Sequence, residues 1–427
     1  MLDINFIRNN PDKVKEGVQK KNVDLKLVDK FLRVDAEWRE KTQGLEHLRS
    51  EQNTVSRELA SEKTESLLSK AALVKNRIAN LGSECGELTA KRTELLEKLP
   101  NLPFDDVPVG PDEAGNIVIR EAGKKPDFDF NPLDYLTLGE KLGIVNVRKA
   151  AEVAGSRFGY LLKEAALLEF ALVDLALKEL ARESFIPIVP PVMIRPEVFT
   201  GMGRLASSQK EERYFLPKDK LYLAGSAEHT IGPFHIDETL DEKDLPKRYV
   251  GFSTCFRREA GSYGKDTKGI LRVHQFDKVE MFSFSHPDKS EEELQLLLKM
   301  QELLMQKLEL PYRVVQICTG DMGWTDARQY DIETWFPGES GPKNKKEGDY
   351  RETHSSSNTT DFQSRGIGAK YKTKDGKKEY VHMLNATAFA IGRTIAAIIE
   401  NYQTKKGTVK IPKALQDYVG KKEIGVS

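Results

Sequence analysis

The chain has few cysteines and no segment apolar enough to span a membrane. Its 427 residues include three cysteines, Cys85, Cys255 and Cys318. They lack the close spacing of zinc ligands, so the sequence predicts neither a disulfide framework nor a zinc site. No apolar run approaches the roughly 20 residues that a membrane-spanning helix needs, and residues 1–5 carry no basic, apolar leader. We therefore expect a cytoplasmic protein with no membrane partner.

Two further absences limit how nucleic acid or nucleotide could bind. Lys+Arg and Asp+Glu are both 66, so the chain has no overall basic charge to attract RNA. Any RNA binding must use local patches and should be sensitive to salt. The sequence also has no Walker loop and no G-x-G-x-x-G segment after a strand, which excludes those two modes of ATP binding.

Residues 27–99 contain no proline and few glycines, and they have a helical apolar pattern. Two runs of apolar residues at three- and four-residue steps are separated near residues 60–68. This pattern predicts an antiparallel helical hairpin of the coiled-coil type, which prolines 100 and 103 end. Basic and acidic residues nearly balance along it. On periodicity alone, the hairpin is a solvated structural or dimerisation coiled coil.

The remaining chain mixes helices and strands, and its length suggests two or three domains. Strands with return hairpins, instead of regular β-α-β alternation, indicate an antiparallel sheet and an α+β fold. The expected segments are a short helix from Pro11 in 1–26, a linker at 100–130, a buried helix at 161–180 and a strand at 184–191. They continue with a helix at 291–308, a strand at 311–319, charged loops at 337–348 and 370–379, and a helix at 395–402.

The most informative segments are residues 256–264, FRREAGSYG, and residues 272–280, RVHQFDKVE. They read as a β-hairpin whose first strand presents Arg257 and Glu259 on one face, because strand side chains alternate. Gly261 and Gly264 are expected to break that strand. A guanidinium can clamp a phosphate, an aromatic ring can stack on a base, and a carboxylate can receive an ammonium or hydroxyl group. The return strand places four residues, each two apart, on one face: His274, Phe276, Lys278 and Glu280.

This hairpin resembles motif 2 of the class II aminoacyl-tRNA synthetases, in the form carried by seryl-tRNA synthetases. The helix and strand at 161–191 resemble motif 1, which builds the family's dimer interface. Pro191 stands at its proline position, and Ser184 stands where glycine is usual. Residues 384–394 resemble motif 3. The resemblance extends over essentially the whole chain and implies a tRNA-binding domain at 1–105, with its hairpin at about 27–99, and a class II catalytic domain at 106–427.

The resemblance implies a set of ATP-binding residues. Arg257 would hold the α-phosphate and the reacting carboxylate, and Glu259 would receive the adenine amino group or make nearby contacts with ATP. Phe276 would stack on one adenine face, while Arg393 would lie on the other face and reach the γ-phosphate. Lysine is poorly suited to stack on a ring and contact a phosphate at the same time. The catalytic residues would be Arg257, Glu280 and Arg393. The full ATP-binding set is Arg257, Arg258, Glu259, Val273, Phe276, Glu352, Thr353, His354, Ser355 and Arg393.

A magnesium site is implied by residues 350–363, which resemble the family's ATP-binding stretch. Glu352 and Ser355 would be the protein ligands, since Mg²⁺ favours oxygen and is usually shared with substrate phosphates. His354 departs from the family, which usually has a small or apolar residue there. The expected small molecules are ATP as substrate and Mg²⁺.

L-serine is the amino acid that the resemblance implies. A site that hydrogen-bonds the serine hydroxyl rejects alanine, because its buried polar groups would otherwise be left unpaired. Ser226 replaces the usual threonine, and Asn385-Ala386-Thr387 replaces a more usual Asn-Gly-Ser. Ser226 and Glu228 would meet the α-ammonium group, and Glu280 and Thr387 would meet the hydroxyl group and neighbouring polar atoms. The serine-binding set is Ser226, Ala227, Glu228, Arg257, Glu280 and Thr387.

No general base is expected for serine activation, because the attacking carboxylate is already ionised and positioning with electrostatics can supply the rate. In the transfer of the seryl group to tRNA, His354 and His382 are candidate bases. A lone histidine is more often structural.

The implied partners are tRNA(Ser), tRNA(Sec) where an organism has one, and a second copy of the chain. The tRNA contacts would come from cations of the helical arm: Arg33, Arg49, Arg57, Lys70, Lys75 and Arg77. Two alternatives stay open. One is a synthetase-like ligase that loads an amino acid onto a carrier protein, although such relatives lack the arm. The other is a non-catalytic coiled-coil protein that binds tRNA.

Overall fold

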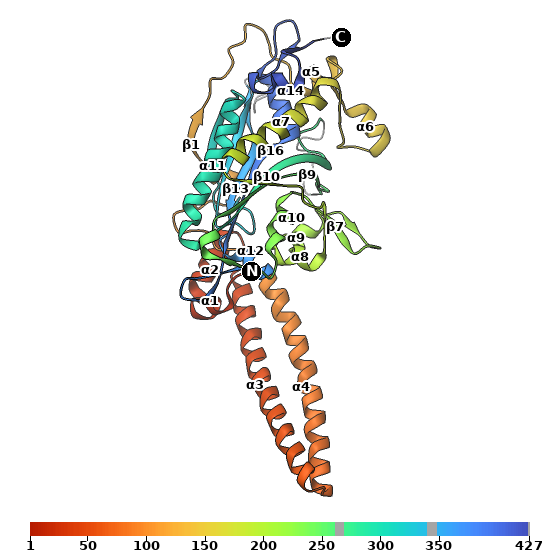
Figure 1. Cartoon of the computed structure of the whole chain (residues 1–427), viewed down its shortest axis with the longest axis vertical. Helices are drawn as coiled ribbons and strands as arrows, with labels where there is room; N and C mark the ends of the chain where they lie inside the picture. The colour runs from red at the N-terminus through yellow and green to blue at the C-terminus, as the bar shows by residue number, and fades with distance from the viewer. Residues whose placement is uncertain (261–268, 340–347, 426–427) are drawn as a thin grey trace. The chain divides into compact units, whose positions relative to one another are not determined.

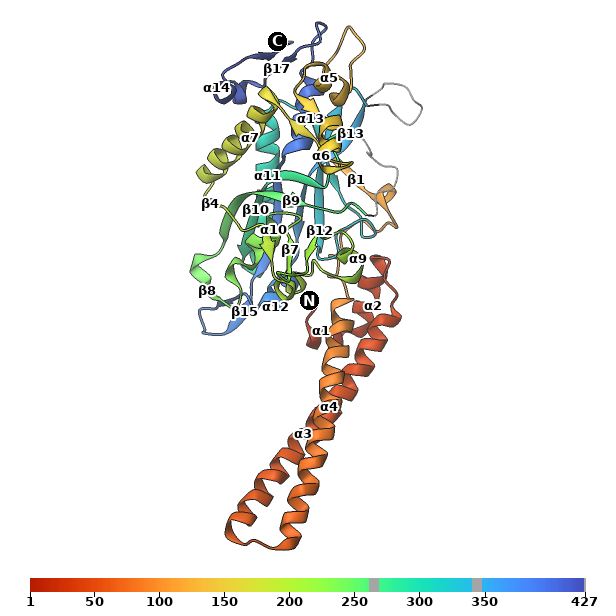
Figure 2. The same cartoon turned by 90° about the vertical axis from the view of Figure 1, so that its right-hand side faces the viewer.

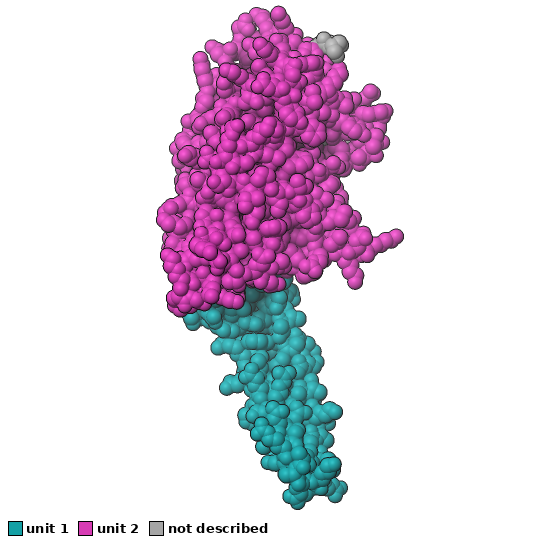
Figure 3. Space-filling model, in the orientation of Figure 1, with its two compact units in different colours: residues 1–100 teal, residues 101–427 magenta. Residues whose placement is uncertain are grey.

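The chain folds into two compact units. The computed structural model describes residues 1–260, 269–339 and 348–425. Contacts within it separate Met1–Pro100 from Asn101–Ser427, coloured teal and magenta in Figure 3. Within the described residues, no helix combines the length and the apolar character needed to cross a membrane.

The first unit is dominated by two long helices, α3 (Lys26–Ser61) and α4 (Glu65–Glu97). They run side by side along their length in both views (Figures 1 and 2). Apolar side chains are buried along both helices, among them Phe31 and Val55 of α3 and Val74 of α4. The Thr64 hydroxyl accepts a hydrogen bond from the Leu67 N–H and caps α4. The predicted helical hairpin is confirmed.

Two short helices precede this hairpin, where the sequence predicted one. They are α1 (Ile4–Asn9) and α2 (Pro11–Lys20). The Asp3 carboxylate accepts from the N–H groups of Asn5 and Phe6, so α1 has its own cap. Asn10, which immediately precedes α2, makes no such side-chain bond.

A buried ionic cluster ties these helices together at one end of the hairpin. Asp35 of α3 is fully buried, and its carboxylate lies 2.8 Å from both the Arg8 and Arg92 side chains. Arg39 approaches to 3.3 Å. Although burial opposes ionisation, the hydrogen bonds from Arg8 and Arg92 outweigh it and lower the pKa of Asp35.

The second unit is built on an eight-stranded sheet (Figure 1). All neighbours pair antiparallel except the edge pair β4 and β9, which is parallel. This confirms the predicted α+β fold with an antiparallel sheet. In spatial order, the strands are β1 (Ile117–Ala122), β11 (Tyr312–Gln316), β12 (Arg328–Phe336), β13 (Asp349–Asn358), β16 (His382–Ala390), β10 (Gln275–Ser285), β9 (Lys247–Phe256) and β4 (Ile186–Ile188).

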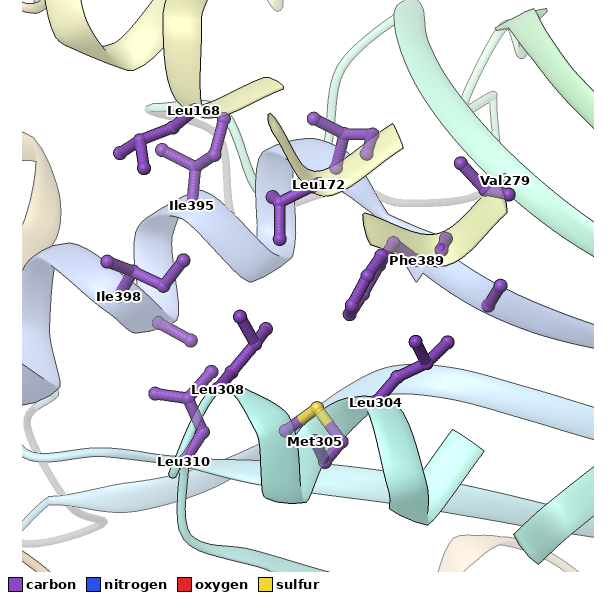
Figure 4. Packing of buried hydrophobic residues seen from close by; sticks show 14 of the residues in the cluster. Leu168, Leu172, Val279, Leu304, Met305, Leu308, Leu310, Phe389, Ile395 and Ile398 are labelled. Atoms are coloured by element: carbon purple, nitrogen blue, oxygen red, sulfur yellow. The ribbon is translucent and has the colours of Figure 1, made fainter. Parts of the chain in front are cut away.

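Three helices cover one face of this sheet and form the main core. They are α7 (Lys163–Arg182), α11 (Ser290–Lys307) and α13 (Ile391–Asn401). Figure 4 shows Leu172 of α7, Ile395 of α13 and Leu304 of α11 in the same buried cluster as Val279 and Phe389 of the strands. Because strand side chains alternate, the residues next to Val279 on β10 point to the opposite face. That face holds the cavity described below.

Smaller elements surround the sheet. The helices are α5 (Tyr135–Lys141), α6 (Val147–Ala154), α8 (Pro196–Gly201), α9 (Ser207–Lys210), α10 (Glu228–Ile231), α12 (Phe362–Ile367) and α14 (Gln416–Val419). The strands are β2 (Val145–Asn146), β3 (Tyr160–Leu161), β5 (Met193–Ile194), β6 (Phe215–Leu216), β7 (Leu221–Leu223), β8 (Thr239–Asp241), β14 (Lys370–Lys372), β15 (Lys378–Tyr380), β17 (Val409–Lys410) and β18 (Glu423–Ile424).

Several predicted boundaries were wrong. The expected linker at 100–130 contains β1, an edge strand paired with β11. The expected loop at 370–379 contains the β14–β15 hairpin, which pairs with β8. The strand predicted at 184–191 is limited to β4, and Ser184 before it has φ +67°, a conformation that favours glycine. The last core helix begins at Ile391, four residues earlier than predicted.

The predicted hairpin strand carrying Arg257 and Glu259 is also wrong in detail. β9 ends at Phe256, and the Arg258 N–H donates to the carbonyl of Glu212 instead of to β10. Glu259 has φ +52°, which is incompatible with a continued strand. Gly261 and Gly264 lie outside the described residues.

Candidate active site

A cavity of about 500 Å³ opens on the sheet face opposite the core helices. This volume is within the usual range for small-molecule sites. Strands β10, β13 and β16 supply its floor, and α13 begins at its edge. The segments around α8, α9 and α10 supply a further wall.

Most of the predicted site residues meet in this cavity. Those that line it are Glu228, Arg257, Glu259, Val273, Phe276, Glu280, Glu352, Thr353, Ser355, Thr387 and Arg393. Four residues of the predicted ATP-binding and serine-binding sets do not line it: Ser226, Ala227, Arg258 and His354.

These four residues lie behind or beside the cavity. Ser226 is buried, and its hydroxyl lies 3.3 Å from the Lys278 ammonium group. Ala227 belongs to a hydrophobic cluster, and the Arg258 side chain is exposed. His354 is buried, where its Nδ1 lies 2.8 Å from the Thr353 hydroxyl. Burial lowers the pKa of His354 to about 3, so it is neutral at physiological pH.

Two β-bulges explain why residues at odd spacings share the cavity face. Glu352 and Ser355 would lie on opposite faces of a regular strand, because they are three residues apart. The register between β12 and β13 shifts at Thr353, and this extra residue brings both side chains to the cavity. The register between β10 and β16 also shifts, at Ala388 of β16, next to the paired residues Thr387 and Glu280.

Arg257 lies at the centre of the site. Its Nε donates to the carbonyl oxygen of Gly225 at 3.0 Å, and its guanidinium lies 5.2 Å from the Phe276 ring centroid. The backbone N–H of Arg257 donates to the His274 carbonyl, and His274 Nδ1 lies 3.0 Å from the Arg257 carbonyl. Arg257 is therefore held at both its backbone and its side chain.

One end of the cavity contains Glu228, which pairs with Arg204 at 2.6 Å. His229 beside it accepts the Gly225 N–H at Nδ1, at 3.0 Å. Burial, followed by repulsion from Arg213 and Arg204, lowers the pKa of His229 well below its usual value. His229 is therefore a neutral structural acceptor next to a charged pair.

The same end contains Glu280, which lies directly opposite Thr387 across β10 and β16. Glu280 is 1% exposed, and the Lys278 ammonium group lies 2.6 Å from its carboxylate. Burial raises the pKa of Glu280 to about 7, although Lys278 opposes this rise. The Nδ2 of Asn385 nearby is buried and has no hydrogen-bond partner among the described residues.

The other end contains Glu352 and Arg393. Arg393 Nη1 donates to the Glu352 carbonyl at 2.8 Å and lies 3.3 Å from its carboxylate. The Glu352 side chain is 51% exposed, toward the cavity. Desolvation opposes ionisation of the Glu352 carboxyl group. The positive charges of Arg393 and then Arg257 outweigh it and lower the pKa of Glu352. Beside it, the Ser355 hydroxyl is held by Gln329 Nε2 at 3.2 Å.

Glu259 is ion-paired within the site. Arg272 Nη1 lies 2.8 Å from its carboxylate, and Arg157 donates to its carbonyl oxygen. A further acceptor role for Glu259 toward adenine must therefore use the remaining lone pairs of the carboxylate.

The sequence interpretation missed several residues of the cavity: Arg204, Arg213, Arg272, Lys278, Asp326, Gln329 and Asn385. Lys278 and Asn385 stand within the recognised motifs, so their positions were a usable signal. Arg204 and Arg213 flank α9, in a segment without helical or strand periodicity. Only the tertiary fold brings that segment to the site.

The predicted RNA-contacting cations of the arm are all exposed: Arg33, Arg49, Arg57, Lys70, Lys75 and Arg77. Lys70 lies 3.8 Å from Glu51 of the facing helix. In the second unit, His382 does not line the cavity, and its Nδ1 lies 2.8 Å from the Ser290 hydroxyl. Within the described ranges, no three His, Cys, Asp or Glu side chains are grouped to hold a metal ion.

Two family models match the chain. Residues 1–103 match the seryl-tRNA synthetase N-terminal domain, and residues 214–402 match the tRNA synthetase class II core domain (G, H, P, S and T). The chain is 41% identical to the serine–tRNA ligase of Thermobifida fusca, over 98% of each chain.

Solved structures agree with these matches. The seryl-tRNA synthetase of Pyrococcus horikoshii complexed with ATP matches with a TM-score of 0.91 and 42% identity, over 100% of both chains. The cytoplasmic serine–tRNA ligase of Naegleria fowleri in complex with AMP matches with a TM-score of 0.86 and 34% identity, over 100% of this chain and 99% of that one. The chain therefore belongs to the seryl-tRNA synthetases, within the class II aminoacyl-tRNA synthetases.

Proposed function

We propose that this chain activates L-serine with ATP and transfers the seryl group to the 3′ end of tRNA(Ser), and of tRNA(Sec) where one exists. The observation that carries the proposal is the convergence of Arg257 with two groups of charged side chains in one cavity. Glu228 and Glu280 lie at one end, while Glu352 and Arg393 lie at the other. Such a site can hold an ammonium group and a polyphosphate on either side of one guanidinium.

The end with Arg393 is the proposed nucleotide site. Adenine stacks between Phe276 and the guanidinium of Arg393, close to the backbone of Val273. Glu259 and Thr353 complete this part of the site. Arg257, anchored on Gly225, holds the α-phosphate. A fixed guanidinium suits this task because it offers several donors without prior reorganisation.

The end with Glu228 and Glu280 is the proposed serine site. The ammonium group of serine meets Glu228, and its hydroxyl meets Glu280 and Thr387, which face each other across two strands. Asn385 Nδ2 is a further donor for the ligand. Alanine would leave these buried groups unpaired, so it should be rejected strongly. Ser226 supports the site from behind through Lys278.

Glu352 and Ser355 fit a magnesium ion held together with ATP phosphates. Both offer oxygen to the same cavity face, and the lowered pKa keeps the Glu352 carboxylate ionised. When bound, the ion would neutralise phosphate charge and orient the polyphosphate. The protein's own part is to fix both oxygens through the β-bulge at Thr353.

The activation step needs no general base. The serine carboxylate is already ionised at neutral pH, so the protein's task is to bring two anions together. Arg257 lies where both can reach it, and it offers positive charge to the anion that they form. In the transfer step, His354 and His382 are unsuited as bases, since neither lines the cavity.

The first unit is the proposed tRNA-binding domain, extending to about residue 105. Exposed Arg and Lys side chains on α3 and α4 contact the phosphate backbone, and this contact should weaken as salt rises. We also propose a homodimer that acts in the cytoplasm. Large apolar side chains are exposed on and beside α7 and β4: Leu167, Phe170, Ile186 and Val189. Such a patch is typical of a protein interface.

The two alternative functions have less support. A ligase for a carrier protein has no use for two helices of 36 and 33 residues that expose cations along their length. A non-catalytic protein would not need to hold Arg257, Glu280 and Glu352 together in a cavity at the desolvation cost of buried charges.

Aminoacylation of tRNA tests the proposal. The full chain is incubated with ATP, Mg²⁺, labelled serine and a tRNA(Ser) transcript, and the label on RNA is measured. We expect label on intact tRNA and none on a transcript that lacks its 3′-terminal adenosine. Label on protein alone would support the carrier ligase. No label on RNA, with folded protein and intact transcript, would contradict the proposal.

A further inference from the structure

Arg213 is a cavity residue to which the proposed function gives no role. It lies between α9 and β6, and its guanidinium is 5.4 Å from the Phe199 ring centroid. A Cβ atom at Gly225 would come within 2.6 Å of Arg213 Nη1. The guanidinium therefore lies directly against the Gly225 backbone, an approach that a side chain at position 225 would block.

Two guanidinium groups meet at this glycine. Arg213 lies against its backbone, and Arg257 donates to its carbonyl oxygen at 3.0 Å. Gly225 comes immediately before Ser226 and close to Glu228, the proposed receptor for the serine ammonium group. The carboxylate of a serine bound there is held within two bonds of that ammonium group. It would therefore lie close to both guanidinium groups.

The remaining cations of the cavity already have carboxylate partners. Arg204 pairs with Glu228, Arg272 with Glu259, Lys278 with Glu280 and Arg393 with Glu352. Among the residues that the structure describes, the two cavity cations that form no ion pair are Arg213 and Arg257. These are also the two that meet at Gly225.

The position of Arg213 is electrostatically costly. Its Nε is buried and has no hydrogen-bond partner within the described part of the chain. Burial, followed by repulsion from Arg257 and Arg204, lowers the pKa of Arg213 to about 10, so the group is still charged at pH 7. A buried charge without a counterion is destabilising. An anion that binds between Arg213 and Arg257 would offset the repulsion between the two guanidinium groups and give Arg213 a hydrogen-bond acceptor.

We infer that Arg213 is a second catalytic cation, which together with Arg257 binds the anionic centre where the serine carboxylate meets the α-phosphate of ATP. This inference rests on the proposed function. A carboxylate oxygen attacks the α-phosphorus and forms the mixed anhydride. The bond from phosphorus to the bridging oxygen breaks, and pyrophosphate leaves with the electron pair. No proton moves, and the charge that remains on the α-phosphate stays beside both guanidinium groups.

A purely structural role for Arg213 is the competing explanation, because its guanidinium also packs on Phe199. The two roles differ in which ligands they affect. A packing residue would affect every ligand of the serine end alike. A residue that binds the reacting anion would distinguish a ligand with a carboxylate from one without it.

The test compares L-serine with L-serinamide, which keeps the ammonium and hydroxyl groups but has no carboxylate. Their dissociation constants are measured by calorimetry on the full chain saturated with α,β-methylene ATP and Mg²⁺. The variants are Arg213→Leu and Arg213→Lys. The matched control is Arg195→Leu, whose side chain is 66% exposed and pairs with Glu197 outside the cavity.

We expect Arg213→Leu to raise the dissociation constant of L-serine about 10-fold to 100-fold and that of serinamide less than about twofold. The larger change corresponds to the loss of hydrogen bonds to a charged group. Arg213→Lys should recover part of the loss, and Arg195→Leu should match the wild type. Equal weakening of both ligands, or no change in either, would overturn the inference. If Arg213→Leu does not fold, Arg213→Gln is measured in the same way.

A failure of this inference can be separated from a failure of the proposed function. Wild-type protein that shows no serine-dependent exchange of pyrophosphate into ATP would contradict the proposed function itself. Exchange in the wild type, with an unchanged ratio of serine to serinamide affinity in Arg213→Leu, would contradict only the role of Arg213.

Discussion

One buried carboxyl group in each unit has its pKa shifted in the opposite direction. In the first unit, arginines 8, 39 and 92 surround Asp35, which keeps it ionised. In the second, Glu400 is fully buried, and its carboxylate accepts the N–H groups of Tyr135 and Gly338. Burial raises the pKa of Glu400 to about 8. The helical arm thus pairs Asp35 with fixed cations, whereas burial holds Glu400 of the second unit in a mainly protonated state at neutral pH.

This difference matches the tasks that we propose for the two units. In this proposal the arm would contact RNA through exposed cations, so its interior needs only to be rigid. The second unit does chemistry on small anions, so its charged groups must lie inside a cavity, where electrostatic interactions are strongest. Four predictions test this division of tasks, from the largest effect to the smallest.

Arg257→Ala should have the largest effect on activity, and this effect should be confined to the second unit. We expect serine-dependent ATP–pyrophosphate exchange to fall about 10²-fold to 10³-fold, as when one preorganised donor to a developing anion is removed. Binding of tRNA(Ser), measured by filter retention, should stay near the wild-type value. Arg148→Ala, on the exposed surface of α6, is the matched control. Full exchange activity in Arg257→Ala would refute the role of this residue.

Asp35→Asn should damage the first unit alone. Removing one partner of a buried ionic cluster leaves arginines without a counterion, and it costs about 3–5 kcal/mol. Hydrogen exchange of the full chain should therefore show faster opening of α3 and α4, with a higher KM for tRNA and an unchanged rate of ATP–pyrophosphate exchange. Glu87→Gln, at an exposed position on α4, is the matched control for the loss of one negative charge. Unchanged hydrogen exchange in α3 and α4 would contradict this account of Asp35.

The pH dependence of stability should have opposite signs in the two units. The pKa of Asp35 is lowered, so its contribution is present above the unfolded pKa near 4 and is lost as pH falls. The pKa of Glu400 is raised, so its contribution is present below about pH 4.5 and is lost as pH rises toward about 8.

The variant Glu400→Gln tests the second half of this statement. It removes the titrating group and should flatten the loss of thermal stability of the second unit between about pH 5 and pH 8. The melting temperature is measured by calorimetry across this pH range, with Glu423→Gln at an exposed position as control. An identical pH dependence in wild type and Glu400→Gln would show that Glu400 is not protonated in the folded protein.

Single substitutions on the arm should have the smallest effect. Arg49→Ala or Arg57→Ala should raise the KM for tRNA a few-fold and reduce the slope of log affinity against log salt by about one unit for each phosphate that is no longer neutralised. Exchange without tRNA should not change. Lys374→Ala, an exposed lysine of the second unit, is the control. If a variant that combines several of these substitutions has the same salt slope as the wild type, the arm does not bind the RNA backbone.

The sequence predicted the arm better than the sheet. The long apolar repeats of residues 27–99 predict α3 and α4 almost to their ends. Apolar residues three and four apart lie on one face of each helix, so the pattern is local in the sequence. The strand β1 was missed, because its residues are exposed and its pairing with β11 joins segments far apart in the chain.

The candidate site shows the same contrast. The motifs predicted Arg257, Glu280 and Arg393, which the fold brings to one cavity. They did not predict the bulge at Thr353, which turns His354 away and keeps Glu352 and Ser355 together. They also did not predict Arg204 and Arg213, because only tertiary packing brings those residues to Gly225 and Glu228.

The most direct test of the account is ATP–pyrophosphate exchange by the full chain, run with each of the twenty amino acids and without tRNA. The account predicts exchange with serine alone, because the activation site lies entirely in the second unit and its polar end fits a small hydroxyl. Exchange with another amino acid would mean that Ser226, Ala386 and Thr387 define a different pocket. No exchange with any amino acid would contradict the proposed activity.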